Sequence, residues 1–396
     1  MAALPGQIAH ARRRSAGFAG ILKEVNPAKI SSRKALARLP VTRKSDLIAL
    51  QKDLPPLGGL NATPLEKLAK LFVSPGPIYE PEGRGKDWWR TARGLFAGGF
   101  RAGDRVLNSF SYHFTPAGSM LESGALALGC TVVPGGTGQT EMQVAAIRDL
   151  ALSGYIGTPS FLRLIVEKAD ELGADISSLR KAQVGAEYLP PALRGKLQER
   201  GLRVTQMYGT ADLGLIAYES LTAEGALTEG MILDEGLILE IVRPGTGDPL
   251  PEGEVGEVVI TTFNRDYPLV RFGTGDLSAV LPGRSACGRT NVRIRGWLGR
   301  ADQSTKVRAM FVTPAQVNDI VRRHREVVRA RLVVEGEAGK DRMTLRCEVR
   351  ESPSGLKEAI VASIREVTKL RGEAELVVPG SLPNDGKVIE DLRKYG

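Results

Sequence analysis

The feature that most limits the fold of this chain is a regular alternation of short apolar runs and amphipathic segments between about residues 104 and 210. The apolar runs are those in "DRVLNSF", "CTVVP", "SGYIGTP", "KAQVGAE" and "LRVTQMYG". Segments with apolar residues at helical spacing separate them, and "SFLRLIVEKADEL" is the clearest example. Such alternation predicts a parallel sheet covered by helices, which is an α/β fold.

Two further changes of pattern divide the rest of the chain. From about residue 230, apolar runs of period 2 alternate with turns such as "RPGTGDPLPEG", which predicts an antiparallel β subdomain over about 230–300. Beyond residue 302 the pattern predicts a helix, two strands, a helix and a strand, a compact α+β domain. We therefore expect two domains, 1–301 and 302–396, with a candidate hinge near residue 300.

Composition narrows the functional classes. Hydrophobic residues make up 42% of the chain and charged residues 25%, as in a soluble globular protein, and no run approaches the roughly 18 apolar residues of a membrane span. The three cysteines, Cys130, Cys287 and Cys347, fit neither a disulfide framework nor a four-cysteine zinc site, which favours a reducing cytoplasm. No nucleic-acid-binding motif accompanies the net charge of +9, and anionic small molecules such as nucleotides or coenzyme A explain it as well.

Two stretches carry groups suited to a nucleotide, "QMYGTADLG" at 206–214 and "YPLVRFGTGDLS" at 267–278. In each, a short strand leads into a glycine-containing turn that presents hydroxyl groups and a carboxylate. These groups can hold ribose hydroxyls or a hydrated Mg²⁺ ion. Taken singly, each stretch fits an ordinary surface turn equally well.

The order of these stretches, followed by "GRAD" at 299–302 and "GK" at 386–387, resembles that of the adenylate-forming enzymes. More narrowly, the chain is similar to the phenylacetate-coenzyme A ligase family, and the similarity covers nearly its whole length. Further matching segments are "LPVTRKSDL", "GCTVVPGGTGQTEMQ", "GTPSFL", "VGAEYLP", "CGRT" and "NDGKVIEDLRK". The resemblance implies an adenylate-forming fold, with a large N-terminal α/β region, its β subdomain and a small mobile C-terminal α+β domain.

The activity implied by this resemblance is that of an AMP-forming acid-CoA ligase. A carboxylate and ATP would give an acyl-adenylate and pyrophosphate, and the thiol of coenzyme A would then give the thioester and AMP. ATP or AMP, Mg²⁺ and coenzyme A are the implied cofactors. The implied partners are a small carboxylic acid and coenzyme A, with no nucleic acid and no membrane, in the cytoplasm, and a homodimer is the assembly to test.

The resemblance also implies roles for individual residues. Asp276 would accept hydrogen bonds from the ribose hydroxyls, since a carboxylate can take two donors at once. Lys387 would enter from the C-terminal domain and neutralise charge on the α-phosphate during adenylation, and that domain would turn on Asp302. Asp212 would hold Mg²⁺, although the family usually has a glutamate there. The residues that would bind the nucleotide are Gly185, Ala186, Glu187, Tyr208, Gly209, Thr210, Asp276 and Arg300.

The segment "NSFSYHFTPAG" at 108–118 corresponds to part of the acyl pocket of the family. Phe110, Tyr112, His113 and Phe114 would line this pocket together with Ala186, and aromatic side chains favour an aryl or arylacetic acid. Core packing at the end of a strand is an equally good interpretation of the same residues. His113 is not expected to act as a base, because the acid enters as its carboxylate.

One segment departs strongly from the family. "SPGPIYEP" at 74–81 stands where the family has a phosphate loop of serines, threonines and glycines followed by lysine, and here Pro75, Pro77 and Ile78 replace hydroxyl residues and Glu80 replaces the lysine. Hydrogen bonds to charged groups contribute about 1.5–3 kcal/mol each, so we expect this loop to bind phosphates poorly. The altered loop favours one alternative to a CoA ligase, a nucleotide- or acyl-binding protein that lost pyrophosphate chemistry. The sequence also leaves open an adenylating enzyme with another acyl acceptor.

Overall fold

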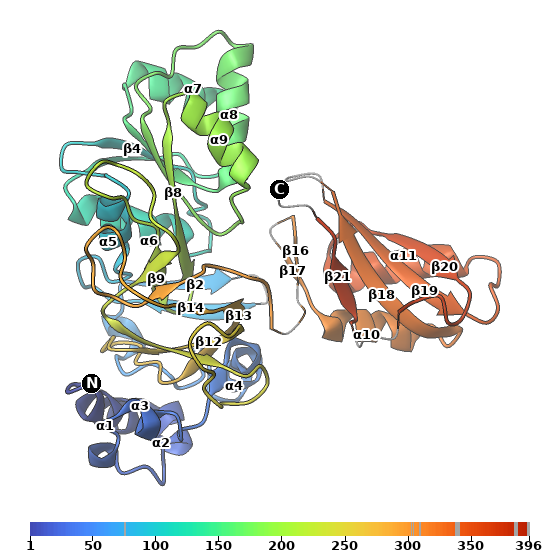
Figure 1. The fold of residues 1–396 in the computed structure, drawn as a ribbon. Coiled ribbons are helices and arrows are strands. Elements are labelled where there is room, and N and C mark those ends of the chain that lie inside the picture. Colours follow the sequence, from blue (N-terminus) through green and yellow to red (C-terminus); the bar gives the residue numbers. More distant parts are fainter. Residues whose placement is uncertain are drawn as a thin grey trace. The chain divides into compact units, whose positions relative to one another are not determined.

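The chain divides into two compact units, Met1–Leu298 and Gly299–Gly396, which are described separately (Figure 1). Their boundary lies slightly before the expected one between residues 301 and 302. The structure is a computed structural model, and it describes the following residues: 1–74, 77–301, 303, 305–308, 310–336, 341–383 and 387–393.

A nine-stranded sheet forms the centre of the first unit, in the order β14-β15-β10-β9-β8-β7-β6-β4-β5. The strands from β4 to β8 pair in parallel, which confirms the fold class expected from the alternating pattern. The remaining strands extend the sheet in antiparallel pairing. The strands are β4 (Arg105–Asn108), β5 (Thr131–Pro134), β6 (Gly154–Gly157), β7 (Lys181–Val184), β8 (Arg203–Thr210), β9 (Gly214–Tyr218), β10 (Met231–Leu233), β14 (Val280–Leu281) and β15 (Arg293–Ile294).

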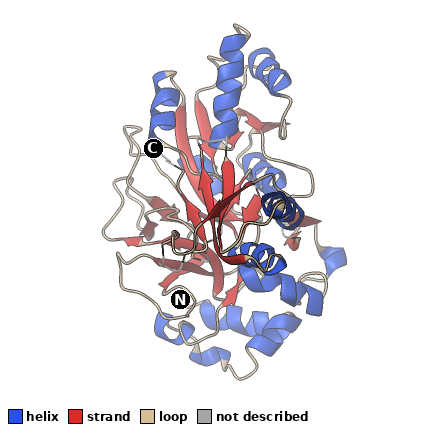
Figure 2. Cartoon of the chain, turned by 90° about the vertical axis from the view of Figure 1, so that its right-hand side faces the viewer, coloured by secondary structure: helices blue, strands red, loops and turns tan. Residues whose placement is uncertain are grey.

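Helices cover both faces of the parallel part of this sheet (Figures 1 and 2). Neighbouring residues of β4 belong to different core clusters: Val106 lies with Leu95 and Leu121, and Leu107 lies with Ile165. The short apolar strands are therefore buried on both sides, as is usual for parallel sheets. The helices are α5 (Thr91–Ala97) and α6 (Ala117–Ala127) on one face, and α7 (Thr140–Asp149), α8 (Pro159–Glu171) and α9 (Pro191–Glu199) on the other.

A second, four-stranded sheet has the order β1-β13-β12-β11. Its strands are β1 (Thr42–Arg43), β11 (Leu237–Val242), β12 (Gly256–Thr262) and β13 (Phe272–Ser278). The pairing is antiparallel apart from the parallel pair of β1 and β13. The residues from about 230 to 300 thus do not form one separate β subdomain, because β10, β14 and β15 join the large sheet.

The N-terminal segment packs against this second sheet. Leu4 and Ile8 of α1 are fully buried in the same core cluster as Ile260 and Phe272. The Gln7 side-chain amide donates to the carbonyl oxygen atoms of residues 262 and 264, at 3.0 and 2.9 Å. The helices of this region are α1 (Leu4–Arg14), α2 (Ala16–Ile21), α3 (Arg33–Leu36) and α4 (Leu47–Asp53), with short 3₁₀ helices at Pro27–Lys29, Lys44–Asp46 and Leu65–Lys67.

A hairpin of two strands, β2 (Lys70–Ser74) and β3 (Ile78–Glu82), occupies the segment expected to be a phosphate loop. Ser74 lies opposite Ile78, and the pairing continues to the ends of both strands. Ile78 and Glu80 are buried whereas Tyr79 between them is exposed, which is the alternation of a strand with one face on the core. The loop is therefore shorter than the expected 74–81.

The second unit is a small α+β domain, and its described part confirms the expected succession of helix, two strands, helix and strand. Its main sheet has the order β20-β19-β18-β21, and α10 and α11 pack on one face of it (Figure 1). In the described part of the chain, no helix has the length and apolar character to cross a bilayer. The elements are β16 (Thr305–Val307), β17 (Met310–Val312), α10 (Pro314–Arg323), β18 (Val327–Glu335), β19 (Arg342–Val349), α11 (Leu356–Thr368), β20 (Glu373–Val377) and β21 (Ile389–Asp391).

Candidate active site

The carboxylate of Asp276 lies where the nine-stranded and four-stranded sheets of the first unit meet. Asp276 is in β13, and the hydroxyl of Tyr208, in β8 of the large sheet, donates to its Oδ2 at 2.8 Å. The indole Nε1 of Trp297 donates to its Oδ1 at 3.1 Å. Asp276 is only 8% exposed, so both bonds are made to an almost buried carboxylate. The structure thus brings together Tyr208 and Asp276, which the resemblance assigned to one nucleotide.

The turn between β8 and β9 presents Thr210 and Asp212. Gly209 precedes it, and a Cβ atom there would lie 2.6 Å from the carbonyl oxygen of Gly214, so a side chain does not fit. The Leu213 amide donates to Thr210 Oγ1 at 3.2 Å, which closes the turn. The backbone therefore fixes Asp212 at the end of the central strand.

Asp212 makes an ion pair that could not be predicted from the sequence. Lys44 Nζ lies 2.7 Å from Asp212 Oδ2, and the Asp212 side chain is fully buried. The other oxygen, Oδ1, is also buried and has no hydrogen-bond partner. Within the described residues, no group of three or more His, Cys, Asp or Glu side chains is placed to hold a metal ion. Asp212 can therefore offer carboxylate oxygen to a cation, but a complete ligand set would need phosphates and water.

Glu80 is buried close to this ion pair. Neither of its carboxylate oxygens has a hydrogen-bond partner of normal geometry. Burial and the negative charge of Asp212 raise the pKa of Glu80 to about 8, although Lys44 and the nearby polar groups of Ser74 lower it. Burial and the charges of Asp212 and Glu80 also raise the pKa of Tyr267, whose buried hydroxyl has no partner either. Glu80 is thus mostly protonated at neutral pH.

The predicted adenine-binding residues Gly185, Ala186 and Glu187 form a bend after β7. Ala186 has a φ of 64°, in the left-handed region. The backbone amide of Ser160, in the first turn of α8, donates to the Glu187 carboxylate at 3.3 Å, and the side-chain amide of Gln206 donates to the Glu187 carbonyl at 3.0 Å. The bend lies at the carboxyl end of the parallel strands, which is the edge where open α/β sheets bind ligands.

The four aromatic residues predicted to line an acyl pocket have different surroundings. Phe110 is buried in the core cluster under α5 and α6, whereas Phe114 is 65% exposed. The Tyr112 hydroxyl accepts a hydrogen bond from the Asn108 side-chain amide at 2.8 Å. The rings of His113 and Phe114 meet edge to face, with centroids 4.7 Å apart. The structure therefore brings His113 and Phe114 together but does not place all four in one aromatic surface.

Arg300, Asp302 and Lys387 belong to the second unit. Lys387 is exposed, and the backbone amide that follows it, of Val388, donates to Gln303 Oε1 at 2.9 Å. Asp302 lies outside the described residues. The roles that the resemblance implies for these three residues remain predictions.

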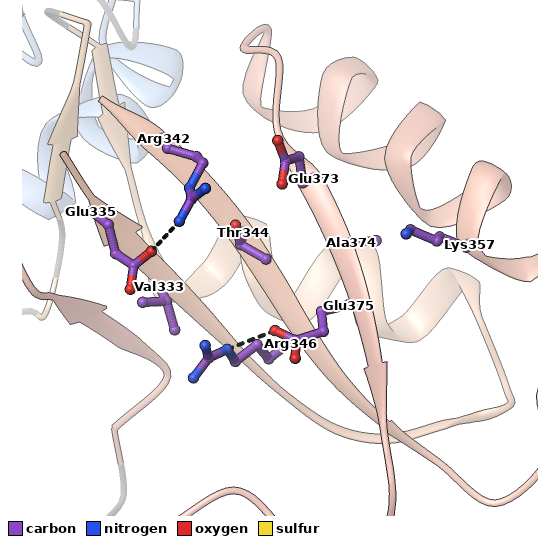
Figure 3. A pocket seen from close by; sticks show the side chains of 9 residues that line it. All are labelled: Val333, Glu335, Arg342, Thr344, Arg346, Lys357, Glu373, Ala374 and Glu375. Carbon is purple, nitrogen blue, oxygen red and sulfur yellow. Dashed lines mark hydrogen bonds and ion pairs between the residues drawn. The ribbon is translucent and has the colours of Figure 1, made fainter. Parts of the chain in front are cut away.

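A pocket of about 240 Å³ lies on the sheet of the second unit, across β18, β19 and β20 (Figure 3). Arg342 pairs with Glu335, and Arg346 pairs with Glu375. Three cationic and three acidic side chains line the pocket, so it offers no concentrated positive charge to an anionic ligand. Its lining residues are Val333, Glu335, Arg342, Thr344, Arg346, Lys357, Glu373, Ala374 and Glu375.

Lys44, Tyr267 and Trp297 are the side chains near Asp212 and Asp276 that sequence reasoning missed. Lys44 stands in "LPVTRKSDL", and Trp297 stands two residues before "GRAD". Lys44 and Asp212 are 168 residues apart, and no periodicity links such distant positions. The only available signal was that both segments match motifs of the same family.

Comparison with known proteins connects this site to a family. Residues 87–264 match the family model for AMP-binding enzymes. Over 93% of the chain, the sequence is 32% identical to a phenylacetate-coenzyme A ligase of Thermus thermophilus, and the match covers 90% of that protein. The chain belongs to the phenylacetate-coenzyme A ligase family. It is an AMP-forming acid-CoA ligase that works through an acyl-adenylate, so the alternative of a binding protein without this chemistry is not favoured.

Two further similarities agree with this assignment of the ligase. The sequence is 30% identical to the phenylacetate-coenzyme A ligase of Escherichia coli K12, over 93% of this chain and 88% of that protein. The structure of a 2-hydroxyisobutyryl-CoA ligase, in complex with 2-HIB-AMP and CoA, matches 99% of this chain and 90% of its own with a TM-score of 0.83. At 22% sequence identity, that likeness confirms the adenylate-forming fold of the ligase.

Proposed function

We propose that the ligase activates an aryl or arylacetic acid. The names of the Thermus and Escherichia relatives support an arylacetic substrate. The edge-to-face pair of His113 and Phe114 after β4 supports an aromatic one. In the first half-reaction, a carboxylate oxygen of the acid attacks the α-phosphorus of ATP and pyrophosphate leaves. In the second, the thiol of coenzyme A attacks the acyl carbonyl and AMP leaves.

The observation that carries the adenylation half-reaction of this proposal is the bonded pair of Tyr208 and Asp276, where the nine-stranded and four-stranded sheets meet. An aspartate fixed by a donor on each oxygen is suited to accept the ribose hydroxyls. Tyr208 then lies against the adenine together with Gly209, and Arg300 lies beside the ribose. The bend at 185–187 completes the adenine and acyl side of the site.

Mg²⁺ would be held by Asp212. The fit rests on the buried Oδ1 atom, which has no hydrogen-bond partner and is an oxygen ligand of the kind that Mg²⁺ prefers. When bound, the ion neutralises charge on the phosphates. Lys44, already paired with Asp212 Oδ2, places a second positive charge beside the same carboxylate.

The second unit supplies Lys387 to the first half-reaction in this proposal. Its ammonium group neutralises charge on the α-phosphate and on the acid carboxylate as they approach. Rotation about Asp302 then withdraws Lys387 and admits the thiol of coenzyme A. The two half-reactions should therefore differ in their need for Lys387.

The β2–β3 hairpin offers few hydrogen-bond donors to the β- and γ-phosphates of ATP, so these phosphates should be bound weakly. In β3 the Tyr79 amide already donates to the Gln51 side chain at 2.9 Å. Neither Pro77 nor Pro81 has an amide hydrogen to donate. Arg90, a cation downstream of the hairpin, pairs with Asp234 and donates to two backbone carbonyls. We therefore expect pyrophosphate exchange to be measurable but slow.

We also propose a cellular compartment and binding partners for the ligase. The three cysteines are all free thiols, which favours a reducing cytoplasm. The proposed ligands are small molecules rather than nucleic acid, and a homodimer is the assembly that we would test by light scattering.

Three measurements test the proposed function. The first is exchange of labelled pyrophosphate into ATP, and the second is thioester formation with coenzyme A. Both rates should depend on added acid, and they should be higher with aryl and arylacetic acids than with alkyl acids. Asp276→Ala should weaken AMP binding at least tenfold, about 1.4 kcal/mol or more, in a calorimetric titration. Exchange supported best by alkyl acids would overturn the substrate class, and unchanged AMP affinity would remove Asp276 from the site.

A further inference from the structure

The segment that ends the first unit is attached to the strand that carries Asp276. Three hydrogen bonds join residues 296–298 to β13: Ser278 Oγ donates to the Gly296 carbonyl at 2.7 Å, the Leu298 amide donates to the Leu277 carbonyl at 2.9 Å, and the third bond is that of the Trp297 indole. Gly296 has a φ of 96°, a conformation that glycine adopts without strain. This backbone turn directs Trp297 to Asp276.

Trp297 is an unusual residue to find in this place. Its side chain is 38% exposed, although tryptophan is mostly buried in folded proteins. Its indole nitrogen can only donate a hydrogen bond, and it meets the Oδ1 atom of Asp276. The Tyr208 hydroxyl meets the Oδ2 atom from the opposite sheet. Two donors on two different oxygens fix the plane of the carboxylate, which one donor would leave able to rotate.

We propose that Trp297 is a positioning residue for nucleotide binding. Its indole N–H holds the Asp276 carboxylate in the orientation that accepts the ribose hydroxyls, and this inference rests on the proposed role of Asp276. A carboxylate can accept several hydrogen bonds at once, so the indole and the ribose hydroxyls can bind the same group. Trp297 therefore orders Asp276 in advance, so that the ribose does not have to order it on binding.

The expected effect is moderate, because the partly exposed Trp297 side chain lets water reach its position and replace part of the lost bond, although Asp276 itself is almost buried. Trp297→Phe keeps an aromatic ring but removes the donor. We expect AMP to bind this variant about threefold to tenfold more weakly, which is the loss of a fraction of one hydrogen bond to a charged group. The affinity for 2′,3′-dideoxy-AMP should not change, because that ligand has no ribose hydroxyls to meet Asp276.

A matched control exists in the same unit. Trp88 Nε1 donates to Asp266 Oδ2 at 2.8 Å, which is the same kind of bond at a carboxylate that the proposal does not use. Trp88→Phe should leave the affinities for AMP and for the dideoxy ligand unchanged. Thermal unfolding of each variant would show that the compared proteins are folded.

Calorimetric titration of the full chain with both ligands tests the proposal. The proteins to compare are the unmodified protein, Trp297→Phe, Trp88→Phe, Asp276→Asn and the double variant Trp297→Phe/Asp276→Asn. We expect Trp297→Phe to reduce the ratio of the affinities for AMP and for dideoxy-AMP. In the Asp276→Asn background, Trp297→Phe should cause no further loss of AMP affinity. An equal loss for both ligands, or an additive loss in the double variant, would show that Trp297 acts on stability or on another part of the nucleotide. If Asp276→Asn leaves AMP binding intact, the proposed ribose site fails and this inference fails with it. If Asp276→Asn weakens binding and Trp297→Phe does not, only the role of Trp297 is overturned.

Discussion

Glu80 should make the first unit less stable at neutral pH than at mildly acid pH. Its pKa is raised from 4.5 to about 8 in the folded protein, chiefly by burial and by the charge of Asp212. Between these two pH values the unfolded chain has released the proton and the folded chain has kept it. The free energy of unfolding therefore falls as the pH rises through this window, and Glu80 has no such effect below pH 4.5, where both states are protonated.

The size of this effect follows from the pKa difference. Each pH unit between the two pKa values costs about 1.4 kcal/mol, so at pH 7 the folded state has lost about 3 kcal/mol through Glu80. Glu80→Gln has nearly the same shape and does not ionise in either state. We expect this variant to be more stable than the unmodified protein by about 3 kcal/mol at pH 7 and to match it near pH 4.5.

Urea unfolding at several pH values, followed by tryptophan fluorescence, measures this difference. All three tryptophans lie in the first unit, so their emission reports its unfolding. Glu82 in the same strand is the control, because its carboxylate already accepts a hydrogen bond from Ser119 and lies near Lys70. Glu82→Gln should not stabilise the protein at any pH. A stability difference between Glu80→Gln and the unmodified protein that does not grow from pH 5 to pH 8 would refute the reasoning.

Three other outcomes are expected. Lys387→Ala should nearly abolish acyl-adenylate formation but spare thioester formation from a supplied acyl-adenylate, and equal loss in both assays would argue against its role in one domain orientation only. AMP should bind the unmodified ligase at least as tightly as ATP, and Glu80→Lys, which restores the lysine of the family at this position, should raise the affinity for ATP relative to AMP. If calorimetry shows that the unmodified ligase binds ATP much more tightly than AMP, this prediction is wrong. Although burial raises the pKa of the Cys287 thiol, hydrogen bonds from Ser220 and Ser285 lower it to about 6, so iodoacetamide should modify Cys287 first at pH 7, and prior labelling of a buried cysteine in a peptide map would disprove it.

The regular parts of the fold could be predicted from the sequence because their signals are local. The parallel strands between residues 105 and 210 are short apolar runs between amphipathic helices, and the strands and helices after residue 310 follow equally clear patterns. The "SPGPIYEP" segment shows the limit of such signals. Its prolines favoured a long turn, but burial of Ile78 and Glu80 on one face, and pairing with β2, made half of it a strand. Tertiary packing decided the structure there, and local propensity did not.

In the candidate site, too, residues within motifs could be predicted and contacts between distant segments could not. Tyr208 and Asp276 could be named in advance because each lies in a motif whose order matches the family. Their bond to each other could not, since it joins strands from two different sheets. Trp297 lies outside the matched motifs, and Lys44 lies in a motif that does not indicate its partner. Only the folded chain shows that they meet the two carboxylates.

The packing of α1 against the second sheet has a consequence for the synthesis of this protein. Gln7 and its partner Thr262 are 255 residues apart in the chain. At about 5–20 residues per second, the ribosome needs about 10–50 s to make that intervening chain. During this time Leu4 and Ile8, fully buried in the finished protein, have no sheet to cover them. The nascent N-terminus is thus a substrate for chaperones that bind exposed apolar segments, and the first unit can close only after most of it has left the ribosome.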